Sequence, residues 1–228
     1  MNKSWFITGT DTGVGKTLAG CVLLQAAQRA GCAAVGYKPV ASGCEAGAQG
    51  LTNEDALALR RYSALSLDYS AINPYALREA TSPHIASARA GVEIDPRRLS
   101  EGLRALEARA DRTLVEGAGG WFTPLGPRYS FADWVKSESL PVLMVVGIKL
   151  GCINHALLTA LAVQQTGLTL AGWIANQIQP PDDFYAPYIA TLRAALPAPC
   201  LGEIPWLPAC DELQHTGDWL TLPKGFLD

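Results

Sequence analysis

The sequence has 228 residues, 49% of them hydrophobic and 17% charged, with a formal net charge of −3 at pH 7. This balance argues against a nucleic-acid-binding or basic membrane-binding surface, so we expect a small-molecule substrate and neither nucleic acid nor membrane as partner. The length suits one large α/β domain over 1–228. No apolar run approaches the roughly 18 residues that span a bilayer, and we expect a cytoplasmic protein.

The six cysteines and three histidines are too scattered for a metal or disulfide framework. The cysteines form no CxxC pair, which argues against a zinc site or a small disulfide-linked fold. We therefore expect reduced thiols, and any metal should be bound through oxygen ligands.

Short apolar runs typical of strands alternate with segments typical of helices along the whole chain. This alternation predicts the α/β class, a single-domain, mostly parallel sheet with helices on both faces. The segment 96–110, between the strands expected at 34–40 and 112–117, carries Leu99, Leu103 and Leu106 on one side. This spacing predicts an amphipathic helix that packs against the sheet. Strands are expected at 5–9, 34–40, 112–117, 141–148, 170–176 and 200–205.

The first strand runs into FITGTDTGVGKT (6–17), which ends like a phosphate-binding loop but is one residue too long. Gly9 and Gly15 enclose five residues, whereas the usual pattern has four. The strand, the glycine-rich turn and the helix expected at 16–31 still provide the context that a phosphate site requires. The alternative is a glycine-rich turn with an incidental lysine.

Backbone N–H groups from Gly13 to Thr17, together with the dipole of the following helix, would hold phosphate oxygens. Lys16 would reach the β and γ phosphates, and Thr17 would offer its hydroxyl to Mg²⁺. The loop therefore predicts binding of ATP or GTP.

Carboxylates for the metal are expected where parallel strands end. Glu116 closes the strand of TLVEGAGG, and the glycines after it would let phosphate or substrate approach the backbone. Asp55 lies in the first turn of the helix predicted from NEDALAL. The alternatives are a solvent-exposed strand-end carboxylate for Glu116 and a helix-dipole stabiliser for Asp55.

Lys38 lies in GYKPVASG at the end of the second strand, near the same edge of the sheet as the loop. Pro39 directs the chain out of the sheet at this point. A lysine here can hold an anion, and the alternative is an ordinary surface lysine.

These stretches and others, in collinear order, resemble the dethiobiotin synthetase family, ATP-dependent ligases that close the ureido ring in biotin synthesis. Gly13 departs from the family, whose members often carry Glu there. The matching stretches are GTDTGVGKT (9–17), GYKPVASG (36–43), NEDALAL (53–59), NPYALREATSPHIA (73–86), VEGAGGWFTPL (115–125), VVGIKLGCINHALLT (145–159), LAGWIAN (170–176) and GEIPWL (202–207).

The resemblance implies a P-loop NTPase-like fold and a role for each matching residue. It places Lys38, Lys16 and Thr12 at the reacting centre, and Thr17, Asp55 and Glu116 around Mg²⁺. It implies ATP as co-substrate, with Asn176 on the adenine. The implied nucleotide-binding residues are Gly13, Val14, Gly15, Lys16, Thr17, Asp55, Glu116, Gly117, Ala118, Gly119, Asn176, Pro205, Trp206, Leu207 and Glu212.

The resemblance also implies 7,8-diaminononanoate and CO₂ as the other substrates, with Ser42 on the diamine, and a homodimer. Residues of one subunit would contact the substrate bound mainly to the other: Gly151, Cys152, Ile153 and Asn154. Free N–H groups at the start of the helix predicted there suit a carboxylate such as the one at the tail of the diamine.

In the implied reaction, one amine takes up CO₂ to form a carbamate. The carbamate oxygen then attacks the γ-phosphate of ATP, and the second amine closes the ring by expelling phosphate. This chemistry needs no protein nucleophile, so Cys152 and His155 are interpreted as structural, and so is His84. Ser82 and Pro83 form a natural helix start, and Thr81 or Ser82 could line the pocket.

Two alternatives remain. A switch ATPase of the partitioning or septum-placement type shares the lengthened loop but usually has a second lysine early in it, where Thr10, Asp11 and Thr12 stand here. An amide-forming ligase acting on a cobalamin precursor shares the nucleotide half. Such ligases normally carry a glutaminase domain, for which this sequence has little room.

Overall fold

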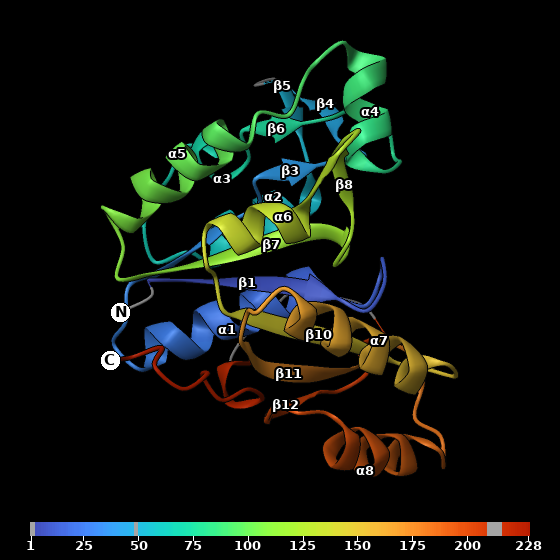
Figure 1. Cartoon of the computed structure of the whole chain (residues 1–228). Helices are drawn as coiled ribbons and strands as arrows, with labels where there is room; N and C mark the ends of the chain where they lie inside the picture. The colour runs from blue at the N-terminus through green and yellow to red at the C-terminus, as the bar shows by residue number, and fades with distance from the viewer. Residues whose placement is uncertain (1–2, 48–49, 209–215) are drawn as a thin grey trace.

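The computed structural model describes residues 3–47, 50–208 and 216–228. Its centre is a six-stranded parallel sheet. The strand order is β12-β11-β10-β1-β7-β2, so β1 lies in the interior of the sheet between β10 and β7. Figure 1 shows the strands stacked in this order through the middle of the molecule. The strands are β1 (Ser4–Gly9), β2 (Ala34–Tyr37), β7 (Arg112–Gly120), β10 (Val142–Ile148), β11 (Leu170–Gln177) and β12 (Cys200–Ile204).

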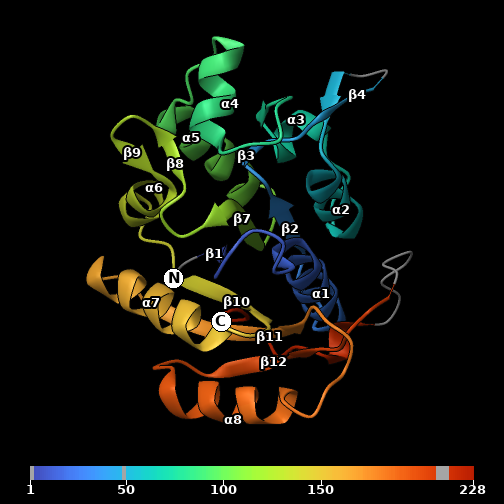
Figure 2. The ribbon, with the colours of Figure 1, turned by 90° about the vertical axis from the view of Figure 1, so that its right-hand side faces the viewer.

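Helices cover both faces of the sheet because its strands are apolar on both sides. Along β1, Trp5 and Ile7 belong to the core on the side of α1, whereas Phe6 belongs to the opposite core. Figure 2 shows α1 and α7 on opposite sides of the sheet. On the first side lie α1 (Lys16–Arg29) and α2 (Glu54–Tyr62), and the second core includes residues of α3 (Tyr69–Ile72), α5 (Pro96–Glu107), α6 (Phe131–Ser137), α7 (Cys152–Gln165) and α8 (Tyr185–Ala195).

Three small sheets and a short helix, α4, lie beyond β2 and β7 (Figure 1). One of the sheets is parallel, and the other two are antiparallel hairpins. Another short element, the 3₁₀ helix Thr216–Asp218, packs against α1. The small elements are β3 (Val40–Ala41) with β6 (Tyr75–Ala76), β4 (Glu45–Gly47) with β5 (Gly50–Thr52), β8 (Pro124–Gly126) with β9 (Tyr129–Ser130), and α4 (Pro83–Ala90).

The predicted fold class is confirmed, with two corrections to the strands. The strand expected at 112–117 continues as β7 to Gly120, so Glu116 lies within the strand and does not close it. The strand expected at 34–40 ends at Tyr37, and the chain resumes as β3 in a different sheet. Pro39 explains the break, because proline has no N–H to donate to a neighbouring strand. The leucine stripe of α5 is buried as predicted. Among the described residues, no helix has the length and apolar character needed to cross a membrane.

Candidate active site

The turn between β1 and α1, residues 9–17, forms a phosphate loop shaped by two left-handed glycines. Gly13 has φ 74° and Gly15 has φ 87°, values that favour glycine. A Cβ atom on Gly15 would lie 2.1 Å from Asn176 Nδ2, so the loop also requires glycine there for space. That amide donates to the Val14 carbonyl at 2.9 Å and ties the loop to β11.

Lys16, the first residue of α1, turns back across the phosphate loop. Its Nζ donates to the Asp11 carbonyl at 3.2 Å, and its side chain is buried. Burial lowers the pKa of Lys16 to about 8, and repulsion from Lys38 acts in the same direction, while the Glu116 carboxylate opposes the shift. A phosphate group near Lys16 would relieve this unfavourable burial of charge.

Lys38, Asp55, Glu116 and Thr17 form a charged cluster beside the phosphate loop. Lys38 Nζ donates to Glu116 Oε1 at 2.5 Å and to Asp55 Oδ2 at 3.0 Å, and it also lies 3.3 Å from the Gly117 carbonyl. The Thr17 hydroxyl donates to Glu116 Oε1 at 2.9 Å. Lys38 directly follows β2, Glu116 lies in the middle of β7, and Thr17 and Asp55 lie in the first turns of α1 and α2, and the sheet order brings these segments together.

The cluster is largely removed from water, and this sets the protonation of its members. Burial tends to lower the pKa of Lys38, but Glu116 and Asp55 outweigh it and raise that pKa. Burial raises the pKa of Glu116, and Lys38 opposes the shift. For Asp55, burial is outweighed by the charge of Lys38 and by the hydrogen bond from it, so its pKa is lowered. Lys38 therefore stays a cation between two acids.

Most of the predicted reacting-centre and phosphate-side residues line one cavity of about 450 Å³, the loop cavity. Asn53, Ala41 and Leu18 also line it, although the sequence analysis assigned them no role. The lining residues are Thr12, Gly13, Gly15, Lys16, Thr17, Leu18, Lys38, Ala41, Ser42, Asn53, Asp55, Glu116, Ala118 and Gly119.

A second cavity of about 480 Å³, the Thr81 cavity, adjoins the first. It runs from the phosphate loop toward the start of α4, and Ser82 and Pro83 also line it. The predicted helix start at Ser82 is confirmed, since Ser82 is the N-cap of α4. His84 accepts or donates a hydrogen bond with the Ser82 hydroxyl at 3.0 Å through Nδ1. Both cavities share Thr12, Ser42, Ala118 and Gly119.

Other predicted site residues lie elsewhere. Gly151 is the left-handed N-cap of α7, and Cys152, Ile153 and Asn154 begin that helix. Of the described residues that line the loop and Thr81 cavities, none comes from this segment. Asn176 is buried in β11 beside the loop. Pro205, Trp206 and Leu207 directly follow β12, and Glu212 lies outside the described residues.

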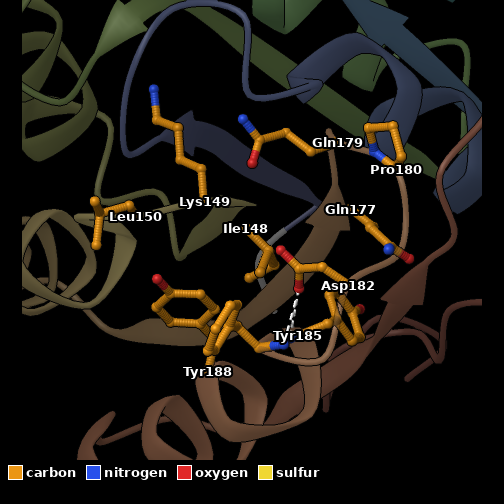
Figure 3. Close-up of a pocket in the computed structure, with 10 residues that line it drawn as sticks. Ile148, Lys149, Leu150, Gln177, Gln179, Pro180, Asp182, Tyr185 and Tyr188 are labelled. Carbon is orange, nitrogen blue, oxygen red and sulfur yellow. Dashed lines mark hydrogen bonds between the residues drawn. The ribbon is translucent and has the colours of Figure 1, made fainter.

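A third cavity, of about 350 Å³, opens where β10 and β11 end (Figure 3). Lys149 lies at its edge and reaches toward the phosphate loop, with Nζ 3.7 Å from Asp11 Oδ2. Tyr185 and Tyr188 of α8 form one wall, and the Tyr185 backbone N–H donates to Asp182 at 3.0 Å. None of these residues was predicted from the sequence to belong to the site.

Comparison with known proteins decides between the families considered. A protein-family model described as an AAA domain matches residues 3–214. The ATP-dependent dethiobiotin synthetase of Salmonella typhi is 62% identical over 222 residues, which are 97% of each chain. The enzyme of the same name from Serratia marcescens is 64% identical over 201 residues, 88% of each chain. The chain belongs to the dethiobiotin synthetase family.

The P-loop NTPase-like fold predicted for this dethiobiotin synthetase family member is confirmed as well. The septum site-determining protein MinD of Pyrococcus horikoshii, solved with Mg-ADP, matches with a TM-score of 0.53 and 16% identity. The match covers 90% of this chain and 82% of that one. At such low identity the likeness shows a shared fold and carries no argument for a switch ATPase.

The dethiobiotin synthetase site contradicts two of the alternatives considered from sequence. Lys38 is not a surface lysine, since only 3% of it is exposed. Glu116 is not a solvent-exposed strand end, since it is 1% exposed. Asp55 does lie in the first turn of α2, as predicted, but it also pairs with Lys38. Residue type alone predicts exposure for Lys38 and Glu116, because charged side chains are rarely buried unless they are paired. These two are paired with each other.

Proposed function

We propose that the protein is an ATP- and Mg²⁺-dependent dethiobiotin synthetase. It joins CO₂ to the two amines of 7,8-diaminononanoate and releases dethiobiotin, ADP and phosphate. The observation that carries the proposal is the ion cluster beside Lys16 of the phosphate loop, in which buried Lys38 pairs with buried Glu116 and with the half-exposed Asp55. A carbamate and a triphosphate both bring negative charge, and this cavity supplies two buried cations to receive it.

ATP is proposed to place its phosphates at the phosphate loop. The N-terminus of α1 and Lys16 would hold the β and γ phosphates, with Gly117, Ala118 and Gly119 opposite them. Asn176 is proposed to contact the adenine. Its Oδ1 atom is buried and has no hydrogen-bond partner among the described residues, so an acceptor is available on that side. Pro205, Trp206 and Leu207 are assigned to the same end, and Glu212 stays a prediction.

Mg²⁺ fits the donor set of the charged cluster. Thr17, Asp55 and Glu116 offer only oxygen atoms, as magnesium prefers, and Glu116 Oε2 is buried without a hydrogen-bond partner among the described residues. Magnesium usually takes few protein ligands and completes its shell with phosphates and water, so one hydroxyl and two carboxylates suffice. When bound, it would neutralise charge on the transferring phosphoryl group.

The ligand set can be tested by magnesium titration. Thr17→Ala, Asp55→Asn and Glu116→Gln should each raise the Mg²⁺ concentration that gives half-maximal rate, by about 10- to 100-fold for the carboxylates. Glu101→Gln is the matched control, because Glu101 is an exposed carboxylate of α5 that does not line the loop cavity. Unchanged titrations in the three site variants would remove these residues from the metal shell.

In the reaction, the protein must position the reacting groups and neutralise the negative charge that develops on them. A carbamate forms when one amine of the diamine takes up CO₂, and the carbamate oxygen attacks the γ-phosphate to give a carbamic-phosphoric anhydride and ADP. The second amine then attacks the carbonyl carbon and expels phosphate. Lys38 and Lys16 are suited to hold the negative charge on both reacting groups in line, and Thr12 lies at the same end of the loop cavity.

The diamine is proposed to lie where the loop cavity and the Thr81 cavity meet. Ser42 and Thr12 line both cavities, which places two hydroxyl groups at their junction. The Thr81 cavity is large enough for an alkyl chain, and Thr81 and Ser82 become candidates to line it. The carboxylate tail would then point away from the phosphate loop.

A homodimer is proposed to complete the site. The Cys152 N–H already donates to the Lys149 carbonyl at 3.0 Å, so the other N–H groups at the start of α7, those of Gly151, Ile153 and Asn154, are the ones suited to the tail carboxylate. This segment does not line the loop cavity or the Thr81 cavity of its own chain. Leu158 and Leu161 of α7, 57% and 52% exposed, and Leu150 just before the helix, 87% exposed, supply an apolar surface for a second copy. Cytoplasmic localisation stays a prediction.

The first experiment follows the product. Pure protein is incubated with 7,8-diaminononanoate, ¹³C-bicarbonate and MgATP, with each component omitted in parallel, and the products are analysed by mass spectrometry. A labelled cyclic urea formed in equal amount with ADP, and absent without the diamine, is the expected result. ATP hydrolysis without a ring product would instead favour the switch ATPase or a ligase with another substrate.

A further inference from the structure

The backbone of Lys38 is held on both sides by the end of α3. Its N–H donates to the Ile72 carbonyl at 2.9 Å, and its carbonyl accepts from Asn73 Nδ2 at 2.7 Å. Asn73 is 3% exposed and also donates to the Tyr75 carbonyl at 3.2 Å. Because both the N–H and the carbonyl of Lys38 are hydrogen-bonded, its backbone is held in place where the side chain enters the charged cluster.

Asn73 is in turn held by Tyr69 at the start of α3. The Tyr69 hydroxyl donates to Asn73 Oδ1 at 2.8 Å and accepts from the backbone N–H of Asn53 at 2.8 Å. Asn53 is the N-cap of α2, with its side chain accepting from the Ala56 N–H. One hydroxyl therefore joins the segment that carries Lys38 to the helix end that carries Asp55.

The same link reaches the proposed diamine site. Asn53 Nδ2 donates to the Ser42 carbonyl at 3.4 Å, so the N-cap of α2 contacts the loop after β3 as well. Burial raises the pKa of Tyr69, against the effect of the Asn53 N–H, so the hydroxyl keeps its proton and can donate to Asn73 at neutral pH. Tyr69 itself does not line the loop cavity or the Thr81 cavity.

We propose that Tyr69 is a positioning residue that fixes Lys38 and Asp55 relative to each other through its hydrogen bonds to Asn73 and Asn53. This inference rests on the proposed function, in which Lys38 holds reacting oxygens and Asp55 holds Mg²⁺. The two side chains meet at 3.0 Å but come from different elements. A shared anchor keeps that spacing while phosphate and metal compete for both groups.

Tyr69→Phe tests the proposal because it removes only the hydroxyl. With MgATP and diamine, kcat should fall about tenfold, and the Mg²⁺ concentration for half-maximal rate should rise about threefold, while KM for the diamine changes little. Tyr37→Phe is the matched control. It removes another tyrosine hydroxyl bond, to the Leu99 carbonyl at 2.9 Å, from the residue next to Lys38, but on the α5 side. It should change thermal stability only.

A second variant separates positioning from folding. Asn73→Leu, of similar size, should lower kcat in the same way, and the double variant with Tyr69→Phe should be no slower than Asn73→Leu alone, because both act along one path. If Tyr69→Phe matches Tyr37→Phe in both kcat and magnesium dependence, Tyr69 is structural and the proposal is wrong. Additive losses in the double variant would equally contradict it.

Failure of the proposed function would be seen separately. If the unaltered protein forms no ring, calorimetry still tests Tyr69, because the gain in ATP affinity on adding Mg²⁺ does not depend on the second substrate. Tyr69→Phe should reduce that gain about threefold, with Tyr37→Phe unchanged. An equal gain in all three proteins would overturn the proposal whatever the substrate is.

Discussion

The phosphate loop and the charged cluster lie side by side but are built in different ways. The loop comes from one contiguous segment, and its shape depends on backbone geometry at Gly13 and Gly15. The cluster consists of side chains from four separate segments of the chain, joined by ion pairs around buried Lys38 and Glu116. The phosphate loop, which one local segment forms, should tolerate changes elsewhere in the fold. The charged cluster depends instead on the order of the strands and on the segments that hold its residues in place.

The two lysines offer the largest test of this contrast. Lys38→Ala should lower turnover by about 10²- to 10³-fold while changing ATP affinity by less than about threefold, because Lys38 acts on charge that develops during transfer. Lys16→Ala should weaken ATP binding and turnover together. Steady-state kinetics and calorimetry measure the two quantities, with Lys136→Ala, which removes an exposed lysine of α6, as control.

Equal losses of affinity and turnover in Lys38→Ala would remove the distinction between the two lysines. Lys38 would then be a second ground-state phosphate ligand, and the cluster would be an extension of the loop. Thermal unfolding of each variant is needed beside the kinetics, since loss of Lys38 leaves Glu116 buried without its cation.

The same contrast explains what could be predicted from the sequence. The loop was readable because strand, turn and helix follow one another in a single string, and the leucine stripe of α5 was readable from its spacing. The pairing of Lys38 with Asp55 and Glu116 was not, because it requires β2 beside β7 and α2 over β2, and neighbours in a sheet are not encoded locally. The rule that parallel strands end at one edge placed Lys38 and Glu116 near the loop, and the resemblance added Asp55, but neither predicted that Lys38 pairs with both acids.

The residues behind the site were missed for a related reason. Asn73 stood in a recognised stretch, NPYALREATSPHIA, but no spacing rule says that its amide bonds the backbone of Lys38. No role was predicted for Asn53, which is the N-cap of α2 and also contacts the Ser42 carbonyl, because that contact depends on where the loop after β3 lies. The breaks that produce β3 and β6 were also unpredicted, apart from the turn signalled by Pro39, since two-residue strands carry too little pattern.

Two glycines in the phosphate loop give a smaller test that separates space from backbone conformation. Gly15→Ala should cost about 1–3 kcal/mol in the free energy of unfolding and weaken ATP binding about tenfold, because its Cβ meets Asn176. Gly13→Ala should cost only about 1 kcal/mol and leave ATP affinity nearly unchanged, since none of the described residues beyond its two chain neighbours lies within 4 Å of the added Cβ. Denaturant unfolding and calorimetry measure both effects.

Similar losses of ATP affinity in the two variants would mean that left-handed backbone geometry alone shapes the loop. The contact with Asn176 would then be incidental. The comparison also bears on the family departure at Gly13, because a residue with open space around its Cβ position can accept a larger side chain if the backbone adapts.

The smallest expected effect is the uptake of a proton by Lys16 when ATP binds. Burial and Lys38 lower the pKa of Lys16 to about 8, against the pull of Glu116. Between that value and 10.5 the unfolded chain keeps a proton that the folded, nucleotide-free protein has lost, so this group makes the free energy of unfolding rise with pH across that window. Bound triphosphate should raise the pKa of Lys16 again, because its negative charge favours the protonated amine.

ATP binding at pH 8.5 should therefore take up about 0.7 proton, a small signal that reports Lys16 alone if ATP itself is fully ionised. Calorimetry in two buffers of different ionisation enthalpy measures it. Lys16→Arg is the matched control, because a guanidinium stays charged at this pH and binding should then take up almost none, whatever the change in affinity. Equal uptake in both proteins would assign the proton to the charged cluster instead, and the loop and cluster would then titrate as one unit.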